Sequence, residues 1–134
     1  MDPRLELAQM LLRKANDDLS MARLLARDAT SPAWGIAFHV QQAVEKSLKA
    51  VLSSGGIGYP RTHSILMLLD LLSDKGWRVP LDQKRLIALT PYGTVIRYDD
   101  LDMSPSEVVG PEKWSDMLAL ADEATAWAEG QISG

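Results

Sequence analysis

Apolar residues recur along the chain at alternating steps of three and four positions, which is the period of a helix that packs one face against a core. The pattern is regular near both ends of the sequence and more interrupted between them. No useful length of sequence alternates apolar and polar residues with the two-residue period of a strand, and no internal repeat is found. The sequence therefore predicts an all-α protein.

Two long helices are expected in the first half of the chain. The first covers about residues 4–29 and carries an apolar stripe of leucine and alanine: Leu5, Ala8, Leu12, Ala15, Leu19, Ala22 and Ala26. Thr30, Ser31 and Pro32 then interrupt the pattern, and the second helix is expected over about residues 32–52. We expect Ser31 to cap this second helix and Pro32 to occupy its first helical position, where its missing N–H costs nothing.

The remaining elements are shorter until the last helix. Glycine and proline in residues 53–60 predict a loop, because neither residue continues a helix well. In chain order we then expect a short apolar helix at 64–73 that ends at Lys75 and Gly76, a helical segment at 81–96 interrupted at 90–93, a polar connector at 99–110 and a last helix at 111–131.

These elements fit one domain that spans residues 1–134. The simplest architecture is an antiparallel, up-and-down four-helix bundle with one additional short helix. Cysteine is absent, which excludes disulfides and a cysteine nucleophile and is compatible with a reducing cytoplasm. The N-terminal residues lack the pattern of a signal peptide and the apolar runs are short, so we expect a cytoplasmic protein without a membrane partner.

The net charge of −4 conceals an uneven distribution. Residues 1–98 carry 13 Lys and Arg against 9 Asp and Glu, whereas residues 99–134 carry Lys113 alone against 9 acids. The acidic balance of the whole chain therefore does not exclude a basic surface that binds phosphate.

The second predicted helix has an unusually polar face. Four residues lie opposite its apolar side, with His39 and Lys46 beside them: Phe38, Gln42, Glu45 and Lys49. Spacing alone favours a solvated face, on which a Glu45 to Lys49 pair contributes about 0.2–0.5 kcal/mol. Phe38, the only phenylalanine of the chain, instead suggests a face covered by another element or by a partner chain.

Three blocks of sequence together resemble the HEPN domain family. They are AFHVQQAVEKSLKAVL followed by a glycine-containing loop, then RTHSILMLLDLL, and later VIRY, and they span residues 37–98. The resemblance implies an all-α bundle that usually forms a homodimer. It also implies an association with nucleotide or RNA chemistry, and often a minimal nucleotidyltransferase encoded beside it, as in toxin-antitoxin systems.

Many members of this family are metal-independent ribonucleases with an arginine, four to six further residues and then a histidine. In that pair the histidine exchanges protons near neutral pH, and the arginine stabilises charge on the phosphate. Here Arg27 precedes His39 by twelve positions, Arg61 precedes His63 by two, and no histidine follows Arg97. The ribonuclease motif is absent, and we predict no catalytic residue.

Arg97 and Tyr98 instead resemble the Arg-Tyr pair that closes the corresponding helix in the non-nuclease branch of the family. That branch often continues with proline, whereas this chain has Asp99. The departure leaves open both the end of this helix and any phosphate contact there.

Two sets of candidate site residues follow. His63 either joins Arg61 and nearby backbone N–H groups in holding an anion, or hydrogen-bonds across the bundle while Thr62 caps the helix. The phosphate-binding or nucleotide-binding candidates are Gln42, Lys46, Lys49, Arg61, His63 and Arg97, and the interface candidates are Phe38, His39, Gln42 and Glu45.

Other chemistries find little support. The glycines of residues 55–58 lack a phosphate-loop arrangement, the two histidines are far apart, and Asp99, Asp100 and Asp102 lack the rest of a calcium loop. We therefore predict no metal and no cofactor. The leading interpretation is a nucleotide- or nucleic-acid-binding accessory module partnered with a minimal nucleotidyltransferase. The alternative is a purely structural homodimerisation or scaffold module, and a ribonuclease that pairs Arg97 with His63 ranks last.

Overall fold

The computed structural model describes residues 2–93 and 111–133, and the side chains of residues 2–93 and 114–133. Every regular element in these ranges is a helix: α1 (Pro3–Ala26), α2 (Ala33–Ser54), α3 (Ile65–Asp74), α4 (Gln83–Ile87), the 3₁₀ helix η1 (Thr90–Gly93) and α6 (Pro111–Ser133). The predicted all-α helical bundle is confirmed. The connector expected at residues 99–110 lies outside the described residues.

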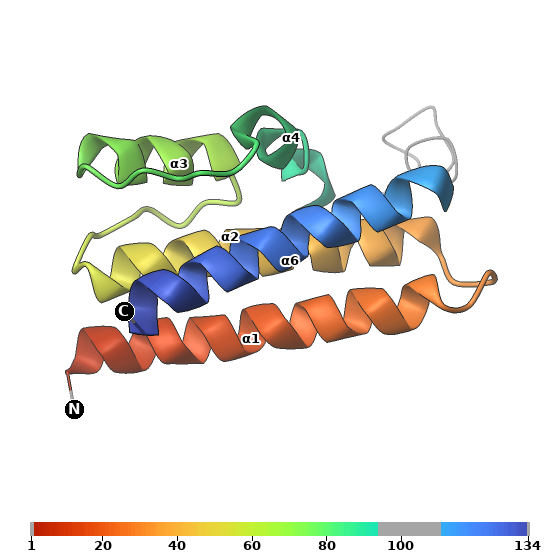
Figure 1. Cartoon of the computed structure of the whole chain (residues 1–134), viewed down its shortest axis with the longest axis horizontal. Helices are drawn as coiled ribbons and strands as arrows, with labels where there is room; N and C mark the ends of the chain where they lie inside the picture. The colour runs from red at the N-terminus through yellow and green to blue at the C-terminus, as the bar shows by residue number, and fades with distance from the viewer. Residues whose placement is uncertain (1, 94–110, 134) are drawn as a thin grey trace.

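Helix α2 is the central element of the bundle. Figure 1 shows α1 along one side of the molecule, α3 and α4 along the opposite side, and α2 with α6 between them. Fifteen of the 22 residues of α2 are buried, including every member of its predicted apolar side. The core forms around these residues because neighbouring helices cover α2 on several sides.

The direction of the helices departs from simple up-and-down alternation. Helix α1 runs antiparallel to α2 and also to α6, to which it is joined by Arg23 with Asp122 (2.7 Å) and Asn16 with Glu129 (3.2 Å). Helices α2 and α6 therefore run the same way (Figure 1).

Helix α3 also runs in the direction of α2 (Figure 1). His63, just before α3, hydrogen-bonds Glu45 in the middle of α2, whereas Trp77, just after α3, lies beside Gly55 at the end of α2. The glycine-containing connection from 55 to 64 makes this order possible. An extended chain rises about 3.3 Å per residue, whereas an α-helix rises about 1.5 Å per residue. The ten connecting residues can therefore run back past the last ten residues of α2.

The helix boundaries differ slightly from the predicted ones. Helix α1 ends at Ala26 and not near residue 29, and just beyond it the Asp28 carboxylate accepts hydrogen bonds from the N–H and the hydroxyl of Thr30. The prediction that Ser31 caps α2 and that Pro32 is its first helical residue is wrong. Pro32 is itself the N-cap, and its carbonyl accepts from the N–H of Gly35.

The glycine exits of α2 and α3 form as predicted. Gly56 and Gly76 have φ values of 69° and 87°, in the left-handed region that favours glycine. In each turn the next residue closes back on the helix: Ile57 N–H donates to the Leu52 carbonyl and Trp77 N–H to the Leu72 carbonyl, both at 2.9 Å. These turns end the two helices that carry most of the core leucines.

The 3₁₀ helix η1 packs directly against the middle of α2. A Cβ atom added to Gly93 would lie 2.4–2.6 Å from three atoms of the Gln41 side chain, which is closer than van der Waals contact allows. Gln41 is fully buried and its amide is hydrogen-bonded to Glu45, Gln42 and the His63 carbonyl. Gln41 therefore has little freedom to move aside, and glycine at position 93 is a packing requirement.

We predict that Gly93→Ala lowers the free energy of unfolding by about 1–3 kcal/mol, the usual cost of forcing an extra methyl group into a filled core. Urea unfolding followed by circular dichroism measures this change. Gly58→Ala is the matched control, because a Cβ there meets nothing within 4 Å and Gly58 has no positive φ. Equal stability of the two variants would contradict the close contact between η1 and α2.

Candidate functional site

Two buried carboxylates organise the polar face of α2. Asp18 comes from α1 and Glu45 from α2 itself, and their residues are 9% and 3% exposed. A buried carboxylate is costly unless hydrogen bonds and opposite charge replace the water it has lost. Nearly all the polar groups predicted on this face are found around one carboxylate or the other.

The Asp18 carboxylate joins α1 to α2. Its Oδ1 lies 2.8 Å from Nδ1 of His39, and its Oδ2 accepts from the ammonium group of Lys46. His39 and Lys46 are two helical turns apart on α2, so one residue of α1 bridges both. The His39 ring also packs edge-on against Phe38, with ring centroids 5.3 Å apart.

The Glu45 carboxylate has three side-chain partners. Its Oε1 accepts from Nε2 of Gln41 at 3.1 Å and lies 2.9 Å from Nδ1 of His63. Its Oε2 accepts from the Lys49 ammonium group at 2.9 Å. Lys49 also lies over the ring of Tyr59, 5.6 Å from its centroid.

The partners of Glu45 also determine its protonation. Burial is the largest single influence on the pKa of Glu45 and acts to raise it. The hydrogen bonds from Lys49, Gln41 and His63, together with the positive charge of Lys49, outweigh burial and hold this pKa below its ordinary value. Glu45 is therefore a carboxylate near neutral pH, and Nδ1 of His63 is the donor in their hydrogen bond.

His63 connects this buried network to the surface. Its side chain is 56% exposed, although its hydrogen-bonding partner Glu45 is only 4% exposed. Because Nδ1 donates to Glu45, Nε2 is the ring nitrogen left for another partner, and it has no hydrogen-bond partner among the described residues. The backbone carbonyl of His63 is fixed as well, since it accepts from Gln41.

Of the two expectations for His63, the hydrogen bond across the bundle is present. Thr62 is not the N-cap that we considered: Ser64 caps α3 by accepting from the N–H of Met67, while Thr62 accepts from the N–H of Ser64. The hydrogen bond between His63 and Glu45 uses Nδ1 alone, and anion binding by His63 stays a prediction.

The sequence-predicted candidates separate into three groups. Lys46 and Lys49 are half-buried and already paired with Asp18 and Glu45. Gln42 is half-buried and donates to Gln41. Arg61 is exposed and makes no ion pair with a described residue, while Arg97 lies outside the described residues.

The interface candidates are all at least half-buried within the chain itself: Phe38, His39, Gln42 and Glu45. Glu45 in particular contacts residues of its own chain and leaves little surface for another. The polar face is therefore covered, as Phe38 suggested, and α1 and the segment before α3 supply part of the cover.

Two participants were missed by sequence reasoning. Asp18 is not among the predicted stripe residues of the first helix, yet it is on the same face as Ala15 and Ala22, three positions after one and four before the other. Gln41 likewise continues the buried positions Ala37 and Val44. Spacing contained both signals, but polar residues at core positions are easily taken for surface ones.

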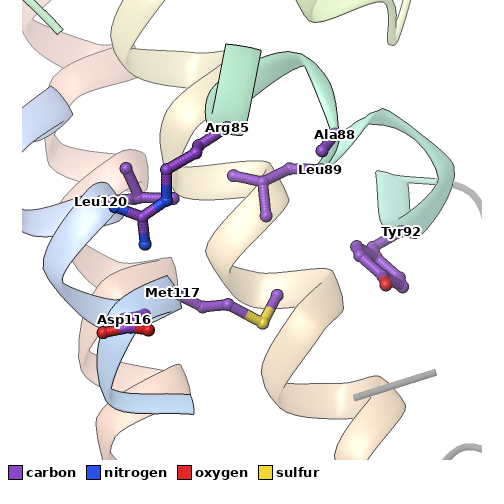
Figure 2. Close-up of a pocket in the computed structure, with 7 residues that line it drawn as sticks. All are labelled: Arg85, Ala88, Leu89, Tyr92, Asp116, Met117 and Leu120. Atoms are coloured by element: carbon purple, nitrogen blue, oxygen red, sulfur yellow. The ribbon is translucent and has the colours of Figure 1, made fainter. Parts of the chain in front are cut away.

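A separate pocket lies between α6 and the segment that contains α4 and η1. It has a volume of about 310 Å³ and a largely apolar lining: Arg85, Ala88, Leu89, Tyr92, Asp116, Met117 and Leu120. Figure 2 shows Arg85 reaching toward α6 from one side, with Tyr92 at the other. None of its lining residues belongs to the network around Glu45 or Asp18.

Within the part of the chain that the structure describes, no three His, Asp or Glu side chains come together as a metal site. Among the same residues, no helix is both long and apolar enough to cross a lipid bilayer.

Comparison with known proteins identifies the family. The HEPN domain model matches residues 8–131, nearly the whole chain, and the protein therefore belongs to the HEPN domain family. No curated protein and no solved structure matches the chain. The family assignment thus agrees with the resemblance that the three sequence blocks carry.

We predict that Glu45→Gln lowers the free energy of unfolding by about 2–3 kcal/mol near neutral pH, because it removes hydrogen bonds to a charged acceptor. A carboxyl group with a lowered pKa stabilises the fold fully above its ordinary pKa, and this contribution is lost as the pH falls through the ordinary range and below it. The difference between wild type and Glu45→Gln should therefore shrink on acidification.

Urea unfolding at a series of pH values between about 7 and about 3 measures this difference. Glu123→Gln is the control, because Glu123 is exposed and makes no hydrogen bond with a described residue. A stability difference for Glu45→Gln that stays constant over this pH range would contradict the lowered pKa.

Proposed function

We propose that the protein is a HEPN-type accessory module that binds the phosphate groups of a nucleotide or nucleic acid and acts with a minimal nucleotidyltransferase in a toxin-antitoxin-like setting. Membership of the family supports this context. The binding surface that we assign is centred on His63, at the start of α3.

One observation carries the binding role: a buried carboxylate holds an exposed histidine ring by one nitrogen. The Glu45 contact of 2.9 Å orients the ring, so its other nitrogen is presented without the entropy cost of fixing a free side chain. A protonated ring presents an N–H to a phosphate oxygen, and the neighbouring exposed Arg61 supplies a permanent positive charge.

The two lysines have a supporting role in this proposal. Each faces a carboxylate within its own chain, so its charge is largely balanced before any ligand arrives. We assign Lys49 to holding Glu45 in place and Lys46 to joining α2 to Asp18. Direct phosphate contacts are assigned to Arg61 and His63, with Gln42 at the edge of the network and Arg97 as a further cation.

The nucleotidyltransferase partner rests on family membership alone. If a neighbouring gene encodes such an enzyme, the two purified proteins should elute together in size-exclusion chromatography. Separate elution at concentrations of tens of micromolar or more would remove this part of the proposal.

A purely structural homodimerisation module is the second candidate. It is favoured by several large apolar side chains that α1 leaves exposed, among them Leu7, Met21 and Leu24. This candidate predicts a dimer that forms without any nucleotide, and it is compatible with binding at His63.

We predict that Arg61→Ala and His63→Ala each weaken the binding of ATP, GTP or a short RNA by about tenfold at low salt. For the RNA, Arg61→Ala should also reduce the slope of log affinity against log salt concentration by about 0.7, the single-strand value for one lost phosphate contact. Isothermal titration calorimetry with a salt series measures both. Arg78→Ala is a matched control, since Arg78 is exposed and makes no ion pair with a described residue.

The absence of saturable binding of all three probes to wild type at low salt would overturn the binding role. RNA integrity is followed in the same samples, and we expect the RNA to remain intact. RNA cleavage that disappears in His63→Ala would instead favour a ribonuclease, whereas cleavage that survives this substitution would exclude a mechanism based on His63.

A further inference from the structure

The exposed surface of α1 carries a stripe of large apolar and charged residues. Its residues recur at steps of three and four and are all exposed: Leu7, Met10, Lys14, Asp17, Met21 and Leu24. The four apolar members are 43%, 37%, 44% and 56% exposed in chain order. This spacing is the heptad pattern by which two helices pack side by side.

The stripe runs along α1 beside the face that the core buries. The buried face of α1 consists of Ala8, Ala15, Asp18, Leu19 and Ala22. The stripe flanks this face: Leu7 lies beside the segment 53–59, and Leu24 is the most exposed member. The core of the single chain therefore leaves much of each apolar member of the stripe exposed to water. Four exposed large apolar side chains along one helix are unusual on a surface that stays solvated.

The stripe is symmetrical about the middle of α1. Two apolar residues stand at each end, and one cation and one anion, Lys14 and Asp17, stand between them. If a second α1 lies antiparallel on the stripe, with the centre between Ala15 and Asn16, each Lys14 faces the partner's Asp17. Neither residue makes an ion pair with a described residue of its own chain.

The same alignment pairs the apolar residues. Leu7 faces the partner's Leu24, and Met10 faces the partner's Met21. A two-fold axis repeats every contact, as an interface between identical chains requires. A parallel alignment would instead stack Lys14 on the partner's Lys14 and Asp17 on the partner's Asp17, which like-charge repulsion disfavours.

We propose that the α1 stripe is the contact surface for a second copy of this chain, packed antiparallel with two Lys14 to Asp17 pairs at its centre. This inference rests on the dimerisation put forward above as the second candidate, not on phosphate binding. The contact extends over about 25 Å of helix at about 1.5 Å per residue. An interface of one helix pair is small, so we expect a dissociation constant on the order of micromolar.

Charge reversal tests this alignment directly. Lys14→Glu and Asp17→Lys each convert two attractive pairs into two repulsive ones, so each should weaken the dimer about tenfold in sedimentation velocity at low salt. An equimolar mixture of the two variants should form a heterodimer, because both pairs are then complementary. The double variant Lys14→Glu/Asp17→Lys should dimerise like wild type.

Lys84→Glu is the matched control, since Lys84 is exposed on α4 and its reversal should leave the dimer unchanged. The chain has no cysteine, so Met10→Cys and Met21→Cys provide a second readout. Under mild oxidation a mixture of these variants should form mainly the mixed disulfide, because position 10 faces the partner's position 21.

Three results would overturn the proposal. The first is a wild-type protein that stays monomeric at hundreds of micromolar. The second is a wild-type dimer that neither charge reversal weakens, and the third is failure of the mixture and of the double variant to restore dimerisation. Nucleotide and RNA binding are measured on the same variants, so loss of the α1 interface and loss of phosphate binding are seen separately.

Discussion

The burial of a carboxylate in the middle of α2 constrains much of the rest of the structure. Glu45 cannot stay charged in the core unless donors surround it, and three side chains supply them: Gln41 and Lys49 from α2, and His63 from the segment before α3. Because His63 must reach the middle of α2, the chain returns along the bundle before α3 begins. The direction of α3 and the position of the proposed binding surface therefore depend on the same contact.

A second carboxylate performs a similar task on the other side of α2. Asp18 binds His39 and Lys46 and so fixes the position of α1 against α2 by charge as well as by packing. The small residues of α1 allow close approach of the two helices, but apolar contacts between small residues do not by themselves fix the register of the two helices. Specific ion pairs give the contact one register, which is the role most often established for buried polar groups. One face of α1 thus serves the core, and the proposed contact with a second copy uses the exposed stripe beside it.

Much of the fold followed from periodicity. The apolar stripe of the first helix and the glycine exits at Gly56 and Gly76 appeared where the pattern indicated. The directions of α3 and α6 did not follow, because a helix stripe identifies a buried face without its orientation, and a connection such as 55–64 has no directional signal. The N-cap of α2 was misassigned because serine is a common N-cap residue, whereas in the structure Pro32 occupies this position.

The candidate site was foreseen in part. Gln42, Glu45, Lys49 and His63 do belong to one network, and the family resemblance pointed to the segments that contain them. What the sequence did not reveal was which charges are already balanced. Pairing of Lys46 with Asp18 depends on the packing of two helices, and such long-range contacts leave no trace in local spacing.

The state of the His63 ring is the most direct test of the account. Long-range proton–nitrogen NMR spectra distinguish the two ring nitrogens, and a His39→Gln variant assigns the signals, since the chain has only two histidines. We expect a proton on Nδ1, held by Glu45, and a shift of the Nε2 resonance when ATP is added, and we expect both to be lost in Glu45→Ala, which removes the acceptor. A ring protonated on Nε2 alone, or one whose nitrogen resonances do not respond to ATP, GTP or a short RNA, would contradict it.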